Sequence, residues 1–413
     1  MQLYDMSEVE ERVVLVGVQW NDDEKIEESL DELEELAQTA GAAVVGRLIQ
    51  SRERIHPGTY IGKGKMAELR DLVEECGATG IVCDDELTSV QMNNLEQALD
   101  CKIIDRTLLI LDIFAARAVS SEGKIQVELA QLKYRASRLV GLRNSLSRLG
   151  GGIGTRGPGE KKLEMDRRLI RTRISQLKQE LGEVVQHREL IRNQRKRTNL
   201  KVAAIVGYTT VGKSSLLNVL TQAEVLEDSM LFSTLDTTTR SLLLPGKQEI
   251  LLTDTVGFIR KLPHNLVEAF KSTLEEARYA DIIIHVVDAS SPQMDSQMYV
   301  VYDTLRQLQV SDKPIITLFN KQDKVVTPVR CRDIQADYSI MTSVKTGQGL
   351  EELKEVLAKI LRNDQIYLEK VLPYDQAGKL QLIRSQGQLL EEEYLSEGIS
   401  VKAYVPVEIY RKI

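Results

Sequence analysis

Aromatic residues, cysteine, histidine and proline are all scarce in this chain of 413 residues. Aromatic side chains make up 5% of it, with a single Trp, and there are 9 Pro, 4 Cys and 4 His. The cysteines show neither zinc-ligand spacing nor a Cys-x-x-Cys pair, and the histidines form no ligand pattern. The composition therefore gives no sign of a disulfide scaffold or a structural zinc site, and we expect ordinary thiols in a reducing compartment.

Long hydrophobic runs are also missing. No apolar run approaches the roughly 20 residues that a membrane-spanning helix needs. The first residues, MQLYDMSEVEERVV, are acidic and lack the basic flank and apolar core of a secretory signal. We expect a cytoplasmic protein without a membrane span, and its length suggests two or three domains.

Positive charge is distributed unevenly. The whole chain carries a net charge of −7, which alone argues against a nucleic-acid partner. Residues 133–201, however, hold 19 Lys and Arg against 6 Asp and Glu, a net +13, so the remainder carries −20. Such a segment is either a pair of solvated helices with many salt bridges or a surface that follows a phosphate backbone.

Short apolar runs alternate with helical patterns in residues 12–118. The predicted strands cover 12–20, 42–50, 80–85 and 101–105, and the predicted helices cover 24–40, 64–76 and 88–99. This alternation is typical of a small parallel α/β domain. Asp84 and Asp85 lie at a strand end, where we expect a solvated turn rather than a cation site.

Two longer helical patterns follow. The first covers residues 124–149, and the second carries Ile170, Ile174, Leu177, Leu181 and Val184 at near-heptad spacing. Between them stands GGGIGTRGPGE (150–160), with six glycines at positions 150–159. We expect a basic helical hairpin with a glycine-rich tip, although a tip of this composition could also be a flexible connector.

A new α/β domain is predicted from residue 199. An apolar strand runs into GYTTVGKS (207–214), which matches the phosphate-binding pattern G-x-x-x-x-G-K-[ST]. Its backbone N–H groups and the following helix N-terminus suit a phosphate. We expect Lys213 to reach the β- and γ-phosphates and Ser214 to bind Mg²⁺. Further on, residues 390–406 predict a strand pair in a small C-terminal module.

Two other predicted strand ends carry groups suited to GTP. In DTVG (254–257), Asp254 is expected to support Mg²⁺ and the Gly257 N–H to meet the γ-phosphate. In NKQD (320–323), Asn320 can bond the Hoogsteen edge of guanine, and the Asp323 carboxylate can accept bonds from guanine N1–H and N2–H₂. Adenine lacks that donor pair, so the loop favours GTP over ATP. SVK (343–345) fits the loop that backs the base.

A switch segment should offer a threonine to Mg²⁺ and the γ-phosphate. LFSTLDTTTR (231–240) contains Thr234, Thr237, Thr238 and Thr239, and spacing alone does not choose among them. After Gly257 stands Phe258, where Ras-like GTPases have a glutamine that positions the attacking water. We therefore expect slow hydrolysis by the protein alone, with a partner organising what is missing.

The chain resembles the HflX family of translational GTPases, in the Obg-HflX-like superfamily. The resemblance rests on GYTTVGKSSLLN, LFSTLDTTTR, DTVGFI, NKQD, GGGIGTRGPGE and HPGTYIGKGKMAEL (56–69), and it covers essentially the whole chain. It implies an N-terminal α/β domain (1–118), a basic helical hairpin (119–198) and a P-loop GTPase domain (199–362). With the small C-terminal α/β module (363–413) that the residues themselves predict, the expected fold is α/β in four parts.

The resemblance also implies the function and the site. The expected partner is the large ribosomal subunit with its RNA, bound by a monomer that splits or recycles ribosomes. Lys213, Thr234 and Gly257 are the implied catalytic residues, Ser214 and Thr234 the Mg²⁺ ligands, and Arg156, Lys161 and Lys162 the RNA contacts. The implied nucleotide-binding residues are Gly207, Tyr208, Thr209, Thr210, Val211, Gly212, Lys213, Ser214, Phe232, Ser233, Thr234, Leu235, Asp236, Asp254, Thr255, Val256, Gly257, Asn320, Lys321, Gln322, Asp323, Ser343, Val344 and Lys345.

Two departures from the family pattern bear on these expectations. The family usually has Asn at the position of Thr210, which helps to hold an activating K⁺ ion in related GTPases, so K⁺ dependence is in question here. It usually continues GETQLE after the tip, where this chain has GEKKLE with two additional lysines. The alternatives to a ribosome-dependent GTPase are a GTP-gated RNA-binding regulator, acting away from the ribosome or in subunit assembly, and a metabolic nucleoside-triphosphate enzyme.

Overall fold

The chain forms two compact units, described here separately. The computed structural model describes residues 11–19, 26–146, 158–197, 200–221, 231–232, 237–245, 248–261, 271–325, 331–363 and 365–413. The first unit contains residues 1–184, 229–235 and 260–271, and the second contains residues 185–228, 236–259 and 272–413. Within the described residues, no helix combines the length and the apolar character that crossing a membrane requires.

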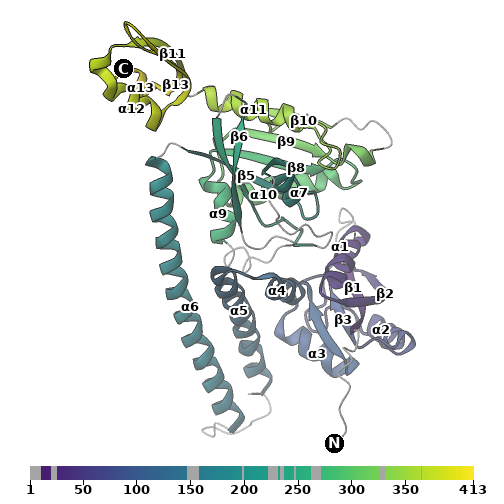
Figure 1. Cartoon of the computed structure of the whole chain (residues 1–413). Coiled ribbons are helices and arrows are strands. Elements are labelled where there is room, and N and C mark those ends of the chain that lie inside the picture. The colour runs from purple at the N-terminus through teal and green to yellow at the C-terminus, as the bar shows by residue number, and fades with distance from the viewer. Residues whose placement is uncertain are drawn as a thin grey trace, which may run out of the picture. The chain divides into compact units, whose positions relative to one another are not determined.

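A four-stranded parallel sheet forms the core of the first unit, with the strand order β2-β1-β3-β4 (Figure 1). Its strands are β1 (Glu11–Gln19), β2 (Ala42–Ser51), β3 (Gly80–Cys83) and β4 (Lys102–Asp105). Helices α1 (Ile26–Thr39), α2 (Lys63–Cys76) and α3 (Ser89–Leu99) make the crossover connections that parallel pairing requires. The predicted parallel α/β domain is confirmed.

Three further helices follow β4. Helix α4 (Arg106–Arg117) begins directly after the strand and was not predicted as a separate element. Helices α5 (Ser121–Leu146) and α6 (Pro158–Arg197) are 26 and 40 residues long and correspond to the two predicted arms of the hairpin. On α6, the predicted apolar seam has its most buried member at Leu177. The glycine-rich tip lies outside the described residues.

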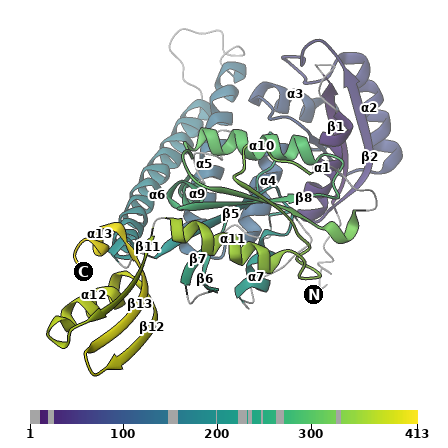
Figure 2. The same cartoon turned by 90° about the horizontal axis from the view of Figure 1, so that it is seen from above.

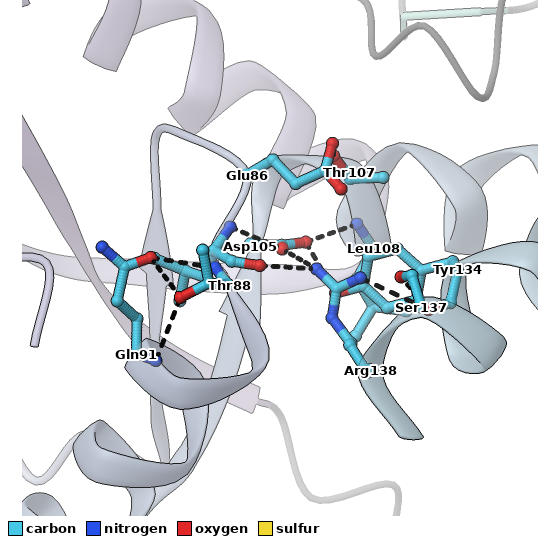
Figure 3. Close-up of polar contacts among 10 residues, drawn as sticks. Glu86, Thr88, Gln91, Asp105, Thr107, Leu108, Tyr134, Ser137 and Arg138 are labelled. Carbon is cyan, nitrogen blue, oxygen red and sulfur yellow. Dashed lines mark hydrogen bonds and ion pairs between the residues drawn. The ribbon is translucent and has the colours of Figure 1, made fainter. Parts of the chain in front are cut away.

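The buried carboxylate of Asp105 joins α5 to the end of the sheet (Figure 3). Asp105 Oδ1 accepts from the Leu108 N–H at 2.9 Å, which caps α4, and from the Tyr134 hydroxyl of α5 at 2.8 Å. Its Oδ2 accepts from the Leu87 N–H at 3.0 Å and pairs with Arg138, also on α5. The arginine lies over the Tyr134 ring, 3.1 Å from its centroid. One carboxylate therefore holds a strand end, a helix cap and the first arm of the hairpin together.

The second unit is built on a six-stranded sheet with the order β10-β9-β8-β5-β7-β6. Its strands are β5 (Lys201–Gly207), β6 (Thr238–Leu244), β7 (Gln248–Asp254), β8 (Ile282–Asp288), β9 (Ile315–Asn320) and β10 (Tyr338–Met341). All pairs are parallel except β6 with β7. The strands that end at the predicted motifs, β5, β7 and β9, were expected, whereas β6 and β10 were not.

Helices cover both faces of this sheet, as its continuous apolar strands require. They are α7 (Lys213–Thr221), α9 (Lys271–Tyr279), α10 (Met294–Gln307) and α11 (Leu350–Asn363). Figure 2 shows α10 on one face and α7 with α11 on the other.

A small C-terminal module follows α11. It contains a three-stranded antiparallel sheet, β11-β13-β12, with helices on one face. Its elements are β11 (Gln365–Leu372), α12 (Ala377–Gln386), β12 (Gln388–Leu395), β13 (Gly398–Pro406) and α13 (Val407–Tyr410). Alternate residues of β13, from Ile399 to Val405, are buried against these helices. The strand pair β12–β13 agrees with the prediction, and β11 was not predicted.

Candidate nucleotide-binding site

The loop between β5 and α7 requires its two glycines. Gly207 and Gly212 have φ values of +156° and +100°. A Cβ on Gly207 would lie 2.3 Å from the Val286 carbonyl oxygen, and one on Gly212 would lie 2.6 Å from Asn320 Nδ2. Both positions therefore exclude larger residues, and the loop can close tightly around a phosphate. Thr210, within the loop, also has a positive φ of +58°, a conformation that Asn adopts more readily than Thr.

Lys213 lies at the start of α7 with its ammonium group turned back into the loop. Its Nζ donates to the Tyr208 carbonyl oxygen at 2.6 Å. Burial lowers the pKa of Lys213 to about 8, although the nearby Asp254 acts in the opposite direction. A buried cation enclosed by backbone N–H groups is suited to an anionic ligand that would neutralise it.

Ser214 and Asp254 form an arrangement that fits Mg²⁺. The Ser214 hydroxyl donates to Asp254 Oδ2 at 2.8 Å, and both residues are buried. A hydroxyl and a carboxylate are hard oxygen donors, and Mg²⁺ usually completes its octahedron with phosphate oxygens and water. Among the described residues, no group of three or more His, Cys, Asp or Glu could hold a metal ion.

The segment DTVGF lies against the phosphate loop. Asp254 ends β7, which pairs in parallel with β5, and the Thr255 hydroxyl donates to the Ile205 carbonyl oxygen at 2.7 Å. A Cβ on Gly257 would lie 3.0 Å from Lys213 Nζ, so this position also favours glycine. The Gly257 backbone is thus beside the lysine expected to bind the terminal phosphates.

Phe258 continues this contact through its backbone. Its N–H donates to the Gly207 carbonyl oxygen at 3.1 Å, and its carbonyl oxygen accepts from the Thr209 N–H at 3.0 Å. The side chain is only 2% exposed. Phe258 therefore offers the nucleotide site no polar side chain and keeps its ring in the apolar core.

Asn320 ties the two predicted base-recognition loops to the phosphate loop. Its Nδ2 donates to the Val211 carbonyl oxygen at 2.8 Å, and its Oδ1 accepts from the Val344 N–H at 3.0 Å. The Ser343 hydroxyl donates to Asp323 Oδ1 at 2.7 Å, which lowers the pKa of this exposed carboxyl group. The carboxylate is therefore ionised, oriented and open to a donor pair such as that of guanine.

Asp288 was not singled out in the sequence. It ends β8, and its carboxylate pairs with Lys321 at 2.7 Å. Lys321 has a positive φ of +63°, so this ion pair helps to fix an unusual turn between Asn320 and Asp323. A carboxylate directly after an apolar strand was the available signal, since carboxyl ends of parallel strands share one edge of a sheet.

Some other predicted site residues lie in other elements of the chain, and some lie outside the described residues. Phe232 packs against Phe114 of α4 in the first unit. Lys161 and Lys162 lie in the first turns of α6. Ser233, Thr234, Leu235, Asp236 and Arg156 lie outside the described residues.

A six-stranded sheet with a phosphate loop, a DxxG segment at its edge and an Asn-Lys-x-Asp loop defines a P-loop GTPase. Three family models match the chain. They are described as GTP-binding GTPase N-terminal (residues 27–115), GTP-binding GTPase Middle Region (117–195) and 50S ribosome-binding GTPase (202–321).

Curated relatives called GTPase HflX align over nearly the full length. The relative from Lacrimispora saccharolytica is 63% identical, over 100% of this chain and 97% of its own. Those from Caldanaerobacter subterraneus and Escherichia coli are 49% and 38% identical, over 99% and 100% of this chain and 94% and 97% of their own. The chain belongs to the HflX family of GTPases and hydrolyses GTP to GDP and phosphate.

Proposed function

We propose that this GTPase binds the large ribosomal subunit and couples its nucleotide cycle to ribosome splitting or recycling in the cytoplasm, acting as a monomer. The observation that carries the proposal is the match of residues 202–321 to a family described as a 50S ribosome-binding GTPase. The excess of +13 in residues 133–201 supports it, because this charge lies largely on α5 and α6 and suits an RNA backbone.

We propose the following residue roles. Lys213 would bind the β- and γ-phosphates, and Ser214 would bind Mg²⁺, with Asp254 orienting the hydroxyl. The Gly257 N–H would donate to the γ-phosphate, and Thr234 would close over it. When bound, Mg²⁺ would neutralise charge that develops on the phosphates. Asn320 and Asp323 would select guanine, and Arg156, Lys161 and Lys162 would contact ribosomal RNA.

The Phe258 ring is buried and apolar, so it cannot orient the water that attacks the γ-phosphate. Another group must position this water. We propose that the docked ribosome orders the switch segments and the attacking water, so that GTP survives until docking. Release of the switch segments after hydrolysis would then free the protein.

The deciding experiment is GTP hydrolysis by the purified protein alone, with large subunits, and with small subunits as the control. A rate increase of about 1,000-fold or more with large subunits alone is expected, the size of effect that transition-state partners supply to GTPases. Rapid hydrolysis without ribosomes, or no response to either subunit, would refute the proposal. Co-sedimentation with subunits separates it from an RNA regulator that acts elsewhere.

The proposed guanine contact can be tested with Asp323→Asn. The amide cannot accept two bonds from guanine N1–H and N2–H₂, so binding of GDP should weaken by about 100-fold or more. Binding of xanthosine diphosphate, which has a carbonyl in place of the 2-amino group, should improve. Asp312→Asn, at another exposed position of the same unit, is the control and should change neither affinity. An equal loss of affinity for GDP and for xanthosine diphosphate would mean that the substitution damages the loop rather than the contact with the base.

A further inference from the structure

The turn that carries the proposed base contacts is strained at one residue. Lys321 has φ and ψ values of +63° and +34°, in the left-handed region where a residue with a Cβ is less stable than glycine. It follows Asn320 directly and precedes Asp323 by two positions, so its conformation sets the directions in which both side chains leave the turn. Such a conformation persists only where surrounding contacts maintain it.

The carboxylate of Asp288 supplies one of these contacts from the neighbouring strand. Asp288 lies opposite Asn320 in the parallel register of β8 with β9, and its Oδ2 is 2.7 Å from Lys321 Nζ. The side chains of Asp288 and Lys321 are 16% and 24% exposed, so water screens the pair less than it would on an open surface. The ion pair therefore links the end of β8 to the strained residue.

The same carboxylate is fixed from its other side. Its Oδ1 accepts from the Ser290 N–H at 3.0 Å and from the Ser290 hydroxyl at 2.6 Å. The Ala289 N–H donates to the Asn320 carbonyl oxygen at 2.9 Å, which fastens the backbone after β8 to the start of the turn. Because Oδ1 is engaged, Oδ2 is directed at Lys321. The carboxylate is thus a prearranged partner for Lys321 rather than one arm of a mobile surface pair.

Backbone hydrogen bonds close the turn around Lys321. The Lys324 N–H donates to the Lys321 carbonyl oxygen at 2.9 Å, and the Gln322 N–H donates to the Thr342 carbonyl oxygen at 3.2 Å. These bonds join main-chain atoms, whereas the pair with Asp288 holds the Lys321 side chain. Loss of the carboxylate charge would therefore leave the turn closed but free to relax at Lys321.

We propose that Asp288 is a positioning residue for guanine recognition, acting through Lys321. By holding Lys321 in its left-handed conformation, Asp288 keeps Asn320 and Asp323 directed at one base and thereby sets the affinity for guanine nucleotides. Its role concerns the base and not the phosphates. The inference rests on the guanine contacts proposed for Asn320 and Asp323, and it is independent of any ribosome contact.

The expected effect on affinity follows from how often the turn is correctly formed. Apparent affinity equals intrinsic affinity multiplied by the fraction of molecules in the binding-competent conformation. If the turn is correctly formed in about one molecule in ten without the Asp288 charge, nucleotides that use this loop bind about tenfold more weakly. The loss should be the same for each such nucleotide, because the contacts in the competent conformation are unchanged.

The test is Asp288→Asn in the full-length protein, with dissociation constants measured for GDP and for inosine diphosphate, which lacks the 2-amino group. The amide keeps the size of the side chain and an acceptor for Ser290, but it removes the charge that faces Lys321. Both nucleotides should bind about tenfold more weakly, with the ratio of the two dissociation constants unchanged. Asp281→Asn is the matched control, because Asp281 precedes the same strand at its opposite end and pairs with Lys201 at 3.1 Å. It should change either constant by less than about twofold.

A double-mutant cycle distinguishes an effect through Lys321 from a general effect on the fold. Glycine adopts the left-handed conformation without a supporting contact. Asp288→Asn should therefore change the affinity for GDP by less than about twofold when Lys321→Gly is already present. An additive loss of about tenfold in that background would overturn the proposal, and so would an unchanged affinity of Asp288→Asn itself.

The ratio of the two dissociation constants supplies a separate outcome. A loss of affinity confined to GDP would mean that Asp288 affects the contact with the 2-amino group alone, which also contradicts a role in holding the whole turn. Failure of the guanine assignment would appear differently, as an unaltered preference between GDP and xanthosine diphosphate in Asp323→Asn.

Discussion

Lys213 illustrates at the residue scale how burial prepares a side chain for its ligand. Its ammonium group is enclosed by the phosphate loop, and its pKa is lowered to about 8 because water is excluded. A bound phosphate would raise that pKa again by favouring the charged form. Nucleotide binding should then be linked to uptake of a proton wherever the free lysine is partly neutral.

This linkage predicts that affinity for GDP falls as pH rises above about 8. Below about pH 8 the free lysine is already charged, and no proton is taken up. Above it, the dissociation constant should increase by up to about tenfold per pH unit, until the pKa of the bound state is reached. Calorimetry in buffers of different ionisation enthalpy measures the proton directly. A constant affinity between about pH 7 and pH 9.5 would show that the free lysine stays charged.

The burial of His285 predicts that the free energy of unfolding also depends on pH. It is buried in β8 with its ring 5.1 Å from that of Tyr302 and its Nδ1 3.9 Å from Asp333 Oδ2. Burial lowers its pKa to about 4 from 6.5, although Asp333 acts in the opposite direction. Because the unfolded chain binds the proton more readily, the free energy of unfolding should fall as pH drops from 6.5 towards 4, by up to about 3 kcal/mol. Urea unfolding of His285→Phe should lose this pH dependence, and an unchanged profile would assign it to other groups.

Individual residues also show where local patterns mislead. Asp84 and Asp85 were expected to form a solvated turn, yet Asp84 is fully buried. It pairs with Arg106 and with Lys261, and Lys261 is 177 residues away in the sequence, a separation that no local pattern reveals. Phe258, by contrast, could be recognised directly, because its place after Asp-x-x-Gly depends only on neighbours in the chain.

At the scale of elements, strongly patterned segments were predicted and the others were not. The strands that lead into the phosphate loop and the Asn-Lys-x-Asp loop are apolar, bounded by glycine or polar residues, and follow a known order. Helix α4, RTLLILDIFAAR, is almost continuously apolar at its centre, so its period cannot distinguish helix from strand. Strand β10 has four residues, and β6 begins in a threonine run that was read as part of a switch.

The attachment of α5 depends on the Asp105 carboxylate and should be sensitive to its partners. Arg138→Met would leave a buried carboxylate without its cation and should cost about 3 kcal/mol of unfolding free energy. Tyr134→Phe removes one of several bonds to Asp105 and should cost about 1 kcal/mol. Arg173→Met, which breaks an exposed pair with Glu128, is the control and should cost less than about 1 kcal/mol.

Urea unfolding with hydrogen exchange on α5 would check these values. A loss for Arg138→Met no larger than that of the control would mean that other contacts hold the helix. The cap, the tyrosine and the arginine all converge on one aspartate, and they come from elements that the sequence placed in different domains (Figure 3). These contacts join residues that are distant in the sequence. For this reason the two helices could be predicted from the sequence, but the attachment of α5 to Asp105 could not.

At the scale of the whole molecule, the uneven charge predicts how partner binding responds to salt. Contacts to RNA phosphates release counterions, so affinity for large subunits should fall steeply with ionic strength. Replacing Lys161 and Lys162 with Gln should reduce the slope of log K against log salt by about 2, roughly one for each lost phosphate contact.

The matched control removes the same number of positive charges from another helix. Lys354 and Lys359 lie on α11, and replacing both with Gln should leave that slope unchanged. Co-sedimentation with large subunits at several salt concentrations measures both slopes. Equal slopes for the two double variants would mean that the lysines at the start of α6 do not contact RNA.

Helix α6 has a mechanical consequence. It is continuous over 40 residues, begins in one compact unit and ends in the other, and is followed within a few residues by the strand that carries the phosphate loop. At 1.5 Å per residue the helix is about 60 Å long. A rigid rod of that length amplifies rotation: a tilt of about 5° at one end moves the other end by about 5 Å. A slight tilt of α6 at its C-terminal end, near the nucleotide-binding domain, would thus move its N-terminal end by about the size of a nucleotide base.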